Sequence, residues 1–280
     1  NHGAIGDGQT DDGPAIRKTI AAAVKAGPGA KVVFEKKRYR LAKADVDYHM
    51  ALRGVSDLTI EGNGAELINN PWNNMVMLDE CEDVTVRGFV VDCDPLPFTQ
   101  GTITEVDEKQ GSFLLNIHDG YDNPVEVYRR IGIEKPNWGW GVCIDPLERR
   151  RKPEAVMHFF LEDVARAEEG GNLLRVQLRD DYIKHAPELS PGDRFVITMK
   201  YGGHGASFNV SRSSNCRLED NTIYTVKYGM THGLSDNRGR IHINGVKITF
   251  KPGTDRLITT PKDGFHCKHN AVGPTIENGL

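Results

Sequence analysis

Five short segments of this 280-residue chain repeat one pattern, and this repeat constrains the fold more than any other feature. Each segment alternates apolar and polar residues, as a β-strand does, and then ends in Gly, Asn or Asp. The turn residues fall at positions 62, 88, 220, 245 and 278, so the steps between them are 26, 132, 25 and 33 residues. The five segments begin at Leu58, Val84, Cys216, Ile241 and Pro274.

Three of these four steps have the length of one coil in a parallel β-helix, where successive strands stack in parallel and their inward residues form the core. Gly, Asn and Asp suit the bends between coils because they adopt left-handed backbone conformations at little cost. The repeat therefore predicts an all-β protein built as a parallel β-helix.

The step of 132 residues is too long for one coil, and subtracting an ordinary coil of 26 leaves a surplus of 106 residues. We expect an inserted domain there, because strand-like runs alternate with Gly, Asp and Asn turns as in a small antiparallel β-barrel or sandwich. Further irregular coils are the alternative. The expected organisation is 1–95 for the N-terminal cap and first coils, 96–203 for the inserted domain and 204–280 for the remaining coils, which we expect to continue past Leu280.

A capping helix is expected near the N-terminus. Gly and Asp residues at 6–13 lead to Pro14, a residue that the first turn of a helix tolerates. The helix should begin near Asp12, which is suited to capping, and end at Gly27. Its apolar stripe consists of Ile16, Ile20 and Val24.

Composition excludes several classes of function. The formal net charge is -4 and acidic and basic residues are mixed, so there is no basic face for nucleic acid. No run of 18 apolar residues could span a membrane. The five cysteines contain no C-x-x-C pair and the ten histidines have no metal-binding spacing, so we expect neither a disulfide framework nor a metal or other cofactor.

One acid stands out as a candidate for catalysis. Asp263 lies one step before a short strand, and if Phe265 and Cys267 point into the core, His266 and Lys268 point outward beside it. A cation lowers the pKa of a neighbouring carboxyl and a second carboxylate raises it, so an acid catalyst here needs an acidic partner. The alternative is a bend residue that caps backbone amides.

Other residues could bind a sugar. Trp140 lies in an aromatic, Gly-rich loop suited to stacking on a sugar ring, although it could equally anchor the inserted domain. His204 lies in a Gly-rich stretch where the chain should return to the coils, and a plain linker would have the same composition. His232 lies about one coil before Asp263 and could face the same groove, or it could be a turn histidine.

Two stretches resemble known families. The opening Gly3-Ala-Ile-Gly-Asp-Gly-Gln-Thr-Asp-Asp12 resembles the N-terminal cap of the pectate-lyase-like right-handed β-helix superfamily, which implies the fold but not the function. The second half is similar to glycoside hydrolase family 110, the inverting α-1,3-galactosidases. The similar blocks are Tyr228-Gly-Met, Leu234-Ser-Asp-Asn237, Leu257-Ile-Thr-Thr260, Asp263-Gly-Phe-His266 and Thr275-Ile-Glu-Asn278.

This second resemblance implies a β-barrel inserted early in the β-helix, Asp263 as the general acid and His266 three residues after it. It also implies that the paired aspartates that supply the base lie one coil further on, beyond Leu280. Around the acid, Pro261-Lys262 and Gly264-Phe265 differ from the family pattern.

The resulting hypothesis is an exported bacterial glycosidase, secreted or periplasmic. It would remove α-galactosyl or related galacto-configured residues from an oligosaccharide or polysaccharide, with inversion and without a cofactor, and sulfated algal glycans are among the candidate substrates. A polysaccharide lyase and a non-catalytic, tailspike-like glycan-binding protein are the alternatives. The lyase would need a base such as Lys262, Lys268 or Arg240 and usually calcium. The oligomeric state stays open, self-association included.

Overall fold

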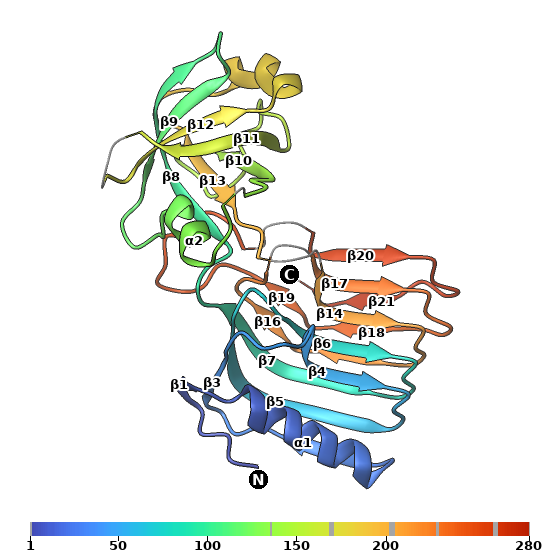
Figure 1. Ribbon diagram of the computed structural model, residues 1–280. Helices are drawn as coiled ribbons and strands as arrows, with labels where there is room; N and C mark the ends of the chain where they lie inside the picture. Colours follow the sequence, from blue (N-terminus) through green and yellow to red (C-terminus); the bar gives the residue numbers. More distant parts are fainter. Residues whose placement is uncertain are drawn as a thin grey trace. The chain divides into compact units, whose positions relative to one another are not determined.

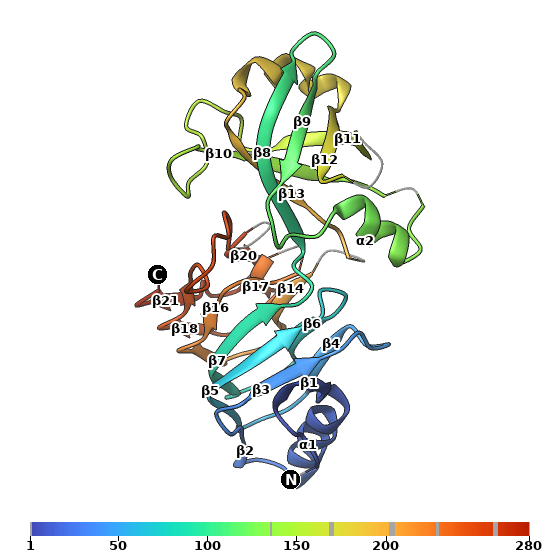
Figure 2. The same cartoon turned by 90° about the vertical axis from the view of Figure 1, so that its left-hand side faces the viewer.

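The computed structural model describes residues 2–134, 136–167, 171–201, 205–227, 230–259 and 263–279. The chain divides into two compact units, which we call the sheet unit and the barrel unit (Figures 1 and 2). The sheet unit consists of Asn1–Pro95, Tyr201–Pro252 and Thr259–Leu280, and the barrel unit of Leu96–Lys200 and Gly253–Ile258.

The sheet unit contains two parallel sheets, and after β3 the chain alternates between them (Figure 1). The first sheet has the order β1 (Asp7–Asp11), β3 (Arg38–Leu41), β5 (Leu58–Asn69), β7 (Thr85–Cys93), β15 (Arg217–Glu219), β18 (His242–Asn244) and β21 (Thr275–Glu277), with β2 (Ala30–Val33), β16 (Thr222–Ile223) and β19 (Lys247–Ile248) beside this path. The second sheet has the order β20 (Phe265–Lys268), β17 (Met230–Ser235), β14 (Ala206–Ser211), β6 (Asn74–Asp79) and β4 (Tyr48–Arg53).

The five segments of the sequence repeat are β5, β7, β15, β18 and β21, and they are consecutive neighbours in the first sheet. Their register is in phase, since Ile60 pairs with Val86, Leu218 with Val86, and Leu218 with Ile243. At or next to each predicted turn position a residue adopts positive φ, as left-handed corners require, although β5 and β7 continue past that point. These residues are Asn63, Gly88, Asp220, Gly245 and Asn278.

The core of the sheet unit is formed by the inward row of each strand. Residues two apart on a strand share a face, so every second side chain of both sheets enters one buried apolar cluster. In the second sheet Leu52, Leu78, Val210 and Leu234 follow one another in register, and each is at most 1 % exposed. Burying such a side chain stabilises the fold by about 1.5–3 kcal/mol.

The helix α1 (Gly13–Ala26) lies beside the first strands, packed against β2 and β4 (Figure 2). Pro14 stands in its first turn, as the sequence predicted, and Ile16 and Ile20 enter the core cluster, whereas Val24 is 39 % exposed. Asp12 makes no side-chain cap. Its carboxylate instead accepts the backbone N–H groups of Ile5 and Gly6.

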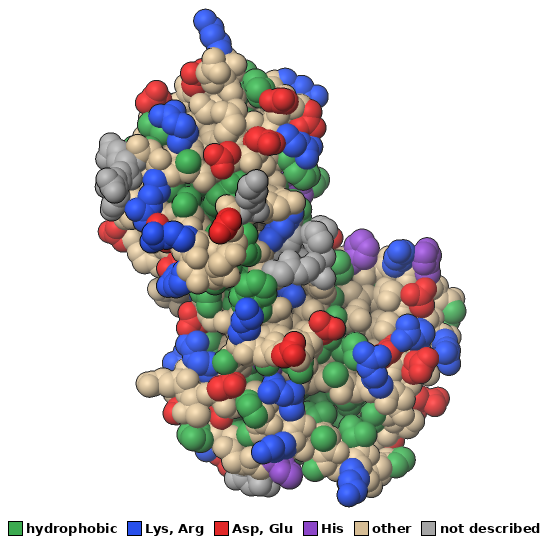
Figure 3. Space-filling view, in the orientation of Figure 1, with side chains coloured by type: hydrophobic (Ala, Val, Ile, Leu, Met, Phe, Trp, Pro, Cys, Tyr) green, Lys and Arg blue, Asp and Glu red, His purple; other side chains and the backbone are tan. Residues whose placement is uncertain are grey.

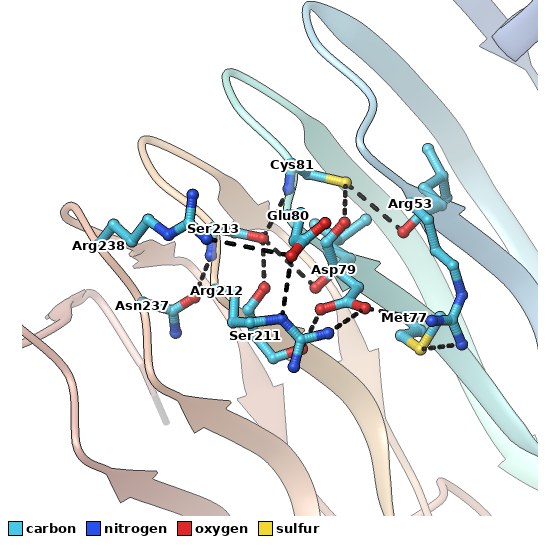
Figure 4. A network of polar contacts seen from close by, with 12 residues as sticks. Arg53, Met77, Asp79, Glu80, Cys81, Ser211, Arg212, Ser213, Asn237 and Arg238 are labelled. Carbon is cyan, nitrogen blue, oxygen red and sulfur yellow. Dashed lines mark hydrogen bonds and ion pairs between the residues drawn. The ribbon is translucent and has the colours of Figure 1, made fainter.

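An outward-facing polar network joins three strands of the second sheet at their carboxyl ends (Figure 4). The Asp79 side chain is only 6 % exposed; one of its oxygens accepts the Ser211 hydroxyl at 2.9 Å. The other oxygen lies 2.6 Å from Arg212 and 3.3 Å from Arg53. Because Arg53, Asp79 and Ser211 pair in register, this one carboxylate links β4, β6 and β14.

The barrel unit is a closed antiparallel barrel, as the strand-and-turn pattern predicted, with Phe113, Phe159 and Phe195 in contact inside it. A short helix α2 (Pro124–Arg130) and a 3-10 segment η1 (Asp180–Glu188) accompany the strands. The barrel order is β10 (Trp140–Ile144), β11 (Phe159–Arg166), β12 (Leu173–Leu178), β9 (Ser112–Ile117), β8 (Phe98–Asp107) and β13 (Arg194–Thr198).

The segment Gly253–Ile258 comes from the second half of the chain and packs against the barrel. The buried Gln100 holds it with both ends of its side-chain amide: Nε2 donates to the Asp255 carbonyl at 3.2 Å and Oε1 accepts from Leu257 N at 2.9 Å. The Tyr121 hydroxyl donates to the Asp255 carboxylate at 2.8 Å. Leu257 is 3 % exposed and packs with Phe98, Ile144 and Val196.

Candidate functional site

The corner at which the chain passes from the first sheet to the second carries the features of interest. Four residues, 70–73, make this connection between β5 and β6, and six, 224–229, between β16 and β17. The connection from β19 to β20 takes sixteen residues, 249–264, and it contains Asp263. Long connections in a compact fold are often functional, because a rigid scaffold presents them to solvent. The chain also leaves this unit at the same corner, between β7 and β14, to form the barrel.

Asp263 stands at the entrance of β20, as the sequence predicted, with a side chain that is 46 % exposed. Its backbone is fixed to the neighbouring strand β17, since its carbonyl accepts the Thr231 N–H at 2.9 Å and the carbonyl of Gly264 accepts the His232 N–H at 3.0 Å. The carboxyl is therefore accessible to solvent on an anchored backbone, which is the placement that a catalytic acid requires.

His266 lies beside this acid. Its Nδ1 is 3.7 Å from Oδ2 of Asp263, and its side chain is 53 % exposed. This distance is longer than a hydrogen bond, but both groups are close enough to contact the same ligand hydroxyl. The structure thus brings together two of the residues that the sequence identified.

The pairing of β20 with β17 shows which side chains of β20 are in the core row. Cys267 pairs with Leu234 and so occupies the core row, yet it is exposed because β20 is the edge strand of its sheet. The other four cysteines are buried. Lys268 ends β20 in the row of Ser235 and is exposed, roughly 16 Å along an extended strand from Asp263.

The remaining sequence candidates lie elsewhere. Trp140 is 7 % exposed within the barrel unit, where its ring contacts Phe160 and His158. His204 lies outside the described residues. His232 is in the core row of β17, in register with Phe265 rather than with Asp263, and it has no exposed surface.

The environment of His232 is aromatic. Its imidazole is stacked between Phe208, at a centroid distance of 5.2 Å, and Phe265, at 4.8 Å. Burial lowers the pKa of this imidazole to about 4, so it is neutral at ordinary pH. Its Nδ1 lies 3.0 Å from the hydroxyl of Thr231, and that hydroxyl donates to the carbonyl of Gly264.

Thr231 is the residue that the sequence did not reveal. It has no exposed surface and contacts both Asp263 and Gly264 through its backbone and side chain. A buried threonine on a short strand is ordinary in sequence, and only the pairing of β17 with the entrance of β20 gives it a role. A polar residue one position before a core histidine, on the strand preceding the acid, is the signal that was available.

On the face shown in Figure 3, acidic and basic side chains are interspersed. Within the described ranges, no three His, Cys, Asp or Glu side chains are grouped so that they could hold a metal ion. No helix of the described chain is long and apolar enough to cross a membrane.

Comparison with known proteins gives two relatives, and no protein-family model matches the chain. The chain is 26 % identical over 277 residues to α-1,3-galactosidase B of Bacteroides thetaiotaomicron, which covers 90 % of this chain and 43 % of that protein. It is also 26 % identical over 289 residues to α-1,3-galactosidase A of Shewanella woodyi, covering 92 % of this chain and 45 % of that protein. The chain therefore spans less than half the length of the curated relatives it matches.

Proposed function

We propose that this chain is part of an inverting glycosidase of the family 110 type, which removes terminal α-linked galactosyl residues, and that its two parallel sheets form a right-handed β-helix. The observation that carries the proposal is a match to two α-1,3-galactosidases over nine-tenths of the chain. Beside that match stands the geometry of the candidate acid, since Asp263 and His266 lie 3.7 Å apart and both side chains are about half exposed.

In this mechanism the protonated Asp263 gives its proton to the leaving glycosidic oxygen. A second, ionised carboxylate activates water on the opposite face of the sugar, roughly 6.5–9.5 Å from the first. Parallel strands lie about 4.8 Å apart, so carboxylates one or two coils apart can reach that separation. We assign the base to the part of the full-length protein that this chain does not span, where the relatives have more than half of their residues.

His266 would bind a sugar hydroxyl next to the acid. A neutral imidazole has one donor and one acceptor nitrogen, so it can donate a hydrogen bond to a sugar hydroxyl or accept one from it. Lys268 lies further along the strand, where a longer oligosaccharide or an anionic substituent could reach it. We extend the proposal to an exported bacterial enzyme, for which sulfated algal galactans are one substrate class to include.

The test is release of monosaccharide by the full-length protein from a panel of α- and β-galactosides, sulfated oligosaccharides among them, with the anomer followed by NMR. Asp263→Asn should lower kcat/KM on natural oligosaccharides about 100- to 10,000-fold, because general acid catalysis is lost. The loss should be much smaller on an aryl galactoside with an acidic phenol, whose departure needs little protonation.

Asp236→Asn is the matched control. Asp236 is 3.7 Å from His269 and 55 % exposed, so the two form an exposed Asp–His pair of the same separation, but this pair lies just past the carboxyl ends of β17 and β20, away from the entrance of β20. The Asp236→Asn substitution should leave kcat/KM unchanged. An unsaturated product would establish a lyase instead. Retained activity in Asp263→Asn would remove the acid from the proposal, and binding without any product would make the chain a glycan-binding protein.

A further inference from the structure

We infer that Thr231 and His232 are positioning residues for the acid: they form a buried anchor that fixes the backbone of Asp263 and Gly264 and thereby the direction of the catalytic carboxyl. This inference rests on the proposed function, because it assigns a role relative to the acid of that reaction. It concerns side chains that have no exposed surface and act only through their contacts.

Four hydrogen bonds make up the anchor. The Thr231 N–H donates to the carbonyl of Asp263 at 2.9 Å, and the His232 N–H donates to that of Gly264 at 3.0 Å. The Thr231 hydroxyl donates to the same Gly264 carbonyl. The fourth bond joins the His232 imidazole to the Thr231 hydroxyl at 3.0 Å. The first two bonds are the ordinary ladder of a parallel sheet, whereas the side-chain bonds are additional and specific to this coil.

The direction of the fourth bond follows from proton counting. A hydroxyl has one hydrogen, and Thr231 gives it to Gly264, so the hydroxyl oxygen can only accept from His232. The imidazole must therefore carry its proton on Nδ1, and a neutral ring meets this requirement. The chain of donors runs from Nδ1 of His232 to Oγ1 of Thr231 and on to the carbonyl that follows the acid.

The anchor is rigid because of where it lies. The imidazole is held between the rings of Phe208 and Phe265, which leave it little freedom to turn. Asp263, unlike the buried Thr231 and His232, has a half-exposed side chain and lies near the end of a sixteen-residue connection. An exposed acid on a long connection needs such support, because a displacement of about 1 Å in a catalytic group can cost 100-fold in rate.

The experiment compares three variants of the full-length enzyme. Thr231→Val keeps the shape of the side chain and removes the hydroxyl; it should lower kcat about ten-fold and change KM less than two-fold. Thr231→Ser restores the hydroxyl and should return kcat to within three-fold of wild type. The acidic group seen in the pH profile of kcat/KM should shift in Thr231→Val and not in Thr231→Ser.

Thr225→Val is the matched control for burying a valine in place of a threonine. Thr225 is also fully buried in the sheet unit, but its hydroxyl has no hydrogen-bond partner among the described residues. Its replacement should leave kcat unchanged and should not reduce stability, since no bond is lost. Thr231→Val leaves Nδ1 of His232 without an acceptor and should lose about 1–3 kcal/mol of folding stability. All rates are therefore measured per folded molecule, well below the melting temperature.

Should Thr231→Val not fold, His232→Phe carries the same test, because it retains the aromatic stack and removes the imidazole donor; we expect a three- to ten-fold loss in kcat. A wild-type enzyme that releases no galactose would defeat the proposed function itself. With an active wild type, an unchanged kcat in the anchor variants, or an equal loss in Thr225→Val, would show that Thr231 serves packing alone.

Discussion

At the scale of single residues, the buried histidines make stability depend on pH. Burial is the main cause that lowers the pKa values of His49 and His232 from 6.5 to about 4. In the unfolded chain both rings take up protons below pH 6.5, and in the folded chain they do so only near pH 4. Stability is therefore complete above pH 6.5 and falls as the pH drops toward 4.

For His232 this effect amounts to roughly 2 kcal/mol at pH 5 relative to pH 7.5. Urea unfolding at the two pH values measures it, and His232→Phe should flatten the difference by that amount. Phe208→Leu disturbs the same aromatic stack without removing a titrating group, so it should lower stability at both pH values and leave the difference unchanged. An unaltered difference in His232→Phe would contradict this account.

Much of the candidate site was visible in the sequence at this scale, and some of it was not. Asp263 could be found because it lies just before a short strand in a block that resembles the galactosidase family, and His266 because it lies three residues further on in the same block; the local sequence alone also fits a bend residue. The distance of His232 from Asp263 along the chain allows it to face the same groove or to lie in a turn, whereas the register puts it in the core row beside Phe265. The distance along the sequence indicates on which strand a residue lies, but not on which face of that strand its side chain lies. A shift of one residue moves the side chain from one face to the other.

At the scale of secondary structure, the network around Asp79 stabilises three neighbouring strands. Asp79→Asn would leave Arg53 and Arg212 without their shared negative charge, and we expect a loss of about 1–3 kcal/mol, moderated by the exposure of both arginines. Glu80→Gln is the control one residue away. Glu80 is 56 % exposed and its ion pairs are longer, so its loss should cost less than about 0.5 kcal/mol. Equal losses in the two variants would contradict a special role for Asp79.

The elements themselves were predicted unevenly from the sequence. The five repeat segments could be recognised because Gly, Asn or Asp ends each of them, and all five are strands of the first sheet. Most strands of the second sheet had no such signature. Strand β6 reads Asn74-Met-Val-Met-Leu-Asp79 and is buried along its whole length, so it lacks the alternation that reveals a half-exposed strand.

At the scale of the whole molecule, the segment Gly253–Ile258 joins distant parts of the sequence within the barrel unit. The bond from Leu257 N to Gln100 spans 157 residues, and nothing in the sequence of this segment indicates its partner. Leu257→Ala should destabilise the barrel by about 2–4 kcal/mol, because its side chain is buried among Phe98, Ile144 and Val196.

Thermal unfolding followed by the fluorescence of Trp138 and Trp140, both buried in the barrel unit, measures this loss. Leu147→Ala is the matched control, since Leu147 belongs to the same unit and is 90 % exposed; its replacement should change stability by less than about 0.5 kcal/mol. If the two leucine variants melted at the same temperature, the segment would not contribute to the barrel.

The position of the insertion also affects the order in which the protein folds. Arg53 of β4 and Asp79 of β6 are 26 residues apart in the sequence. Asp79 of β6 and Ser211 of β14 are 132 residues apart. Closing the longer loop from a flexible chain costs about 1.4 kcal/mol more in entropy. If the barrel folds first, the two ends of the inserted segment are already close together, and the loop that remains to be closed between β6 and β14 is shorter. During synthesis, β4 and β6 would thus have an unpaired neighbouring edge until the barrel residues are complete, and such an edge is open to pairing with other chains.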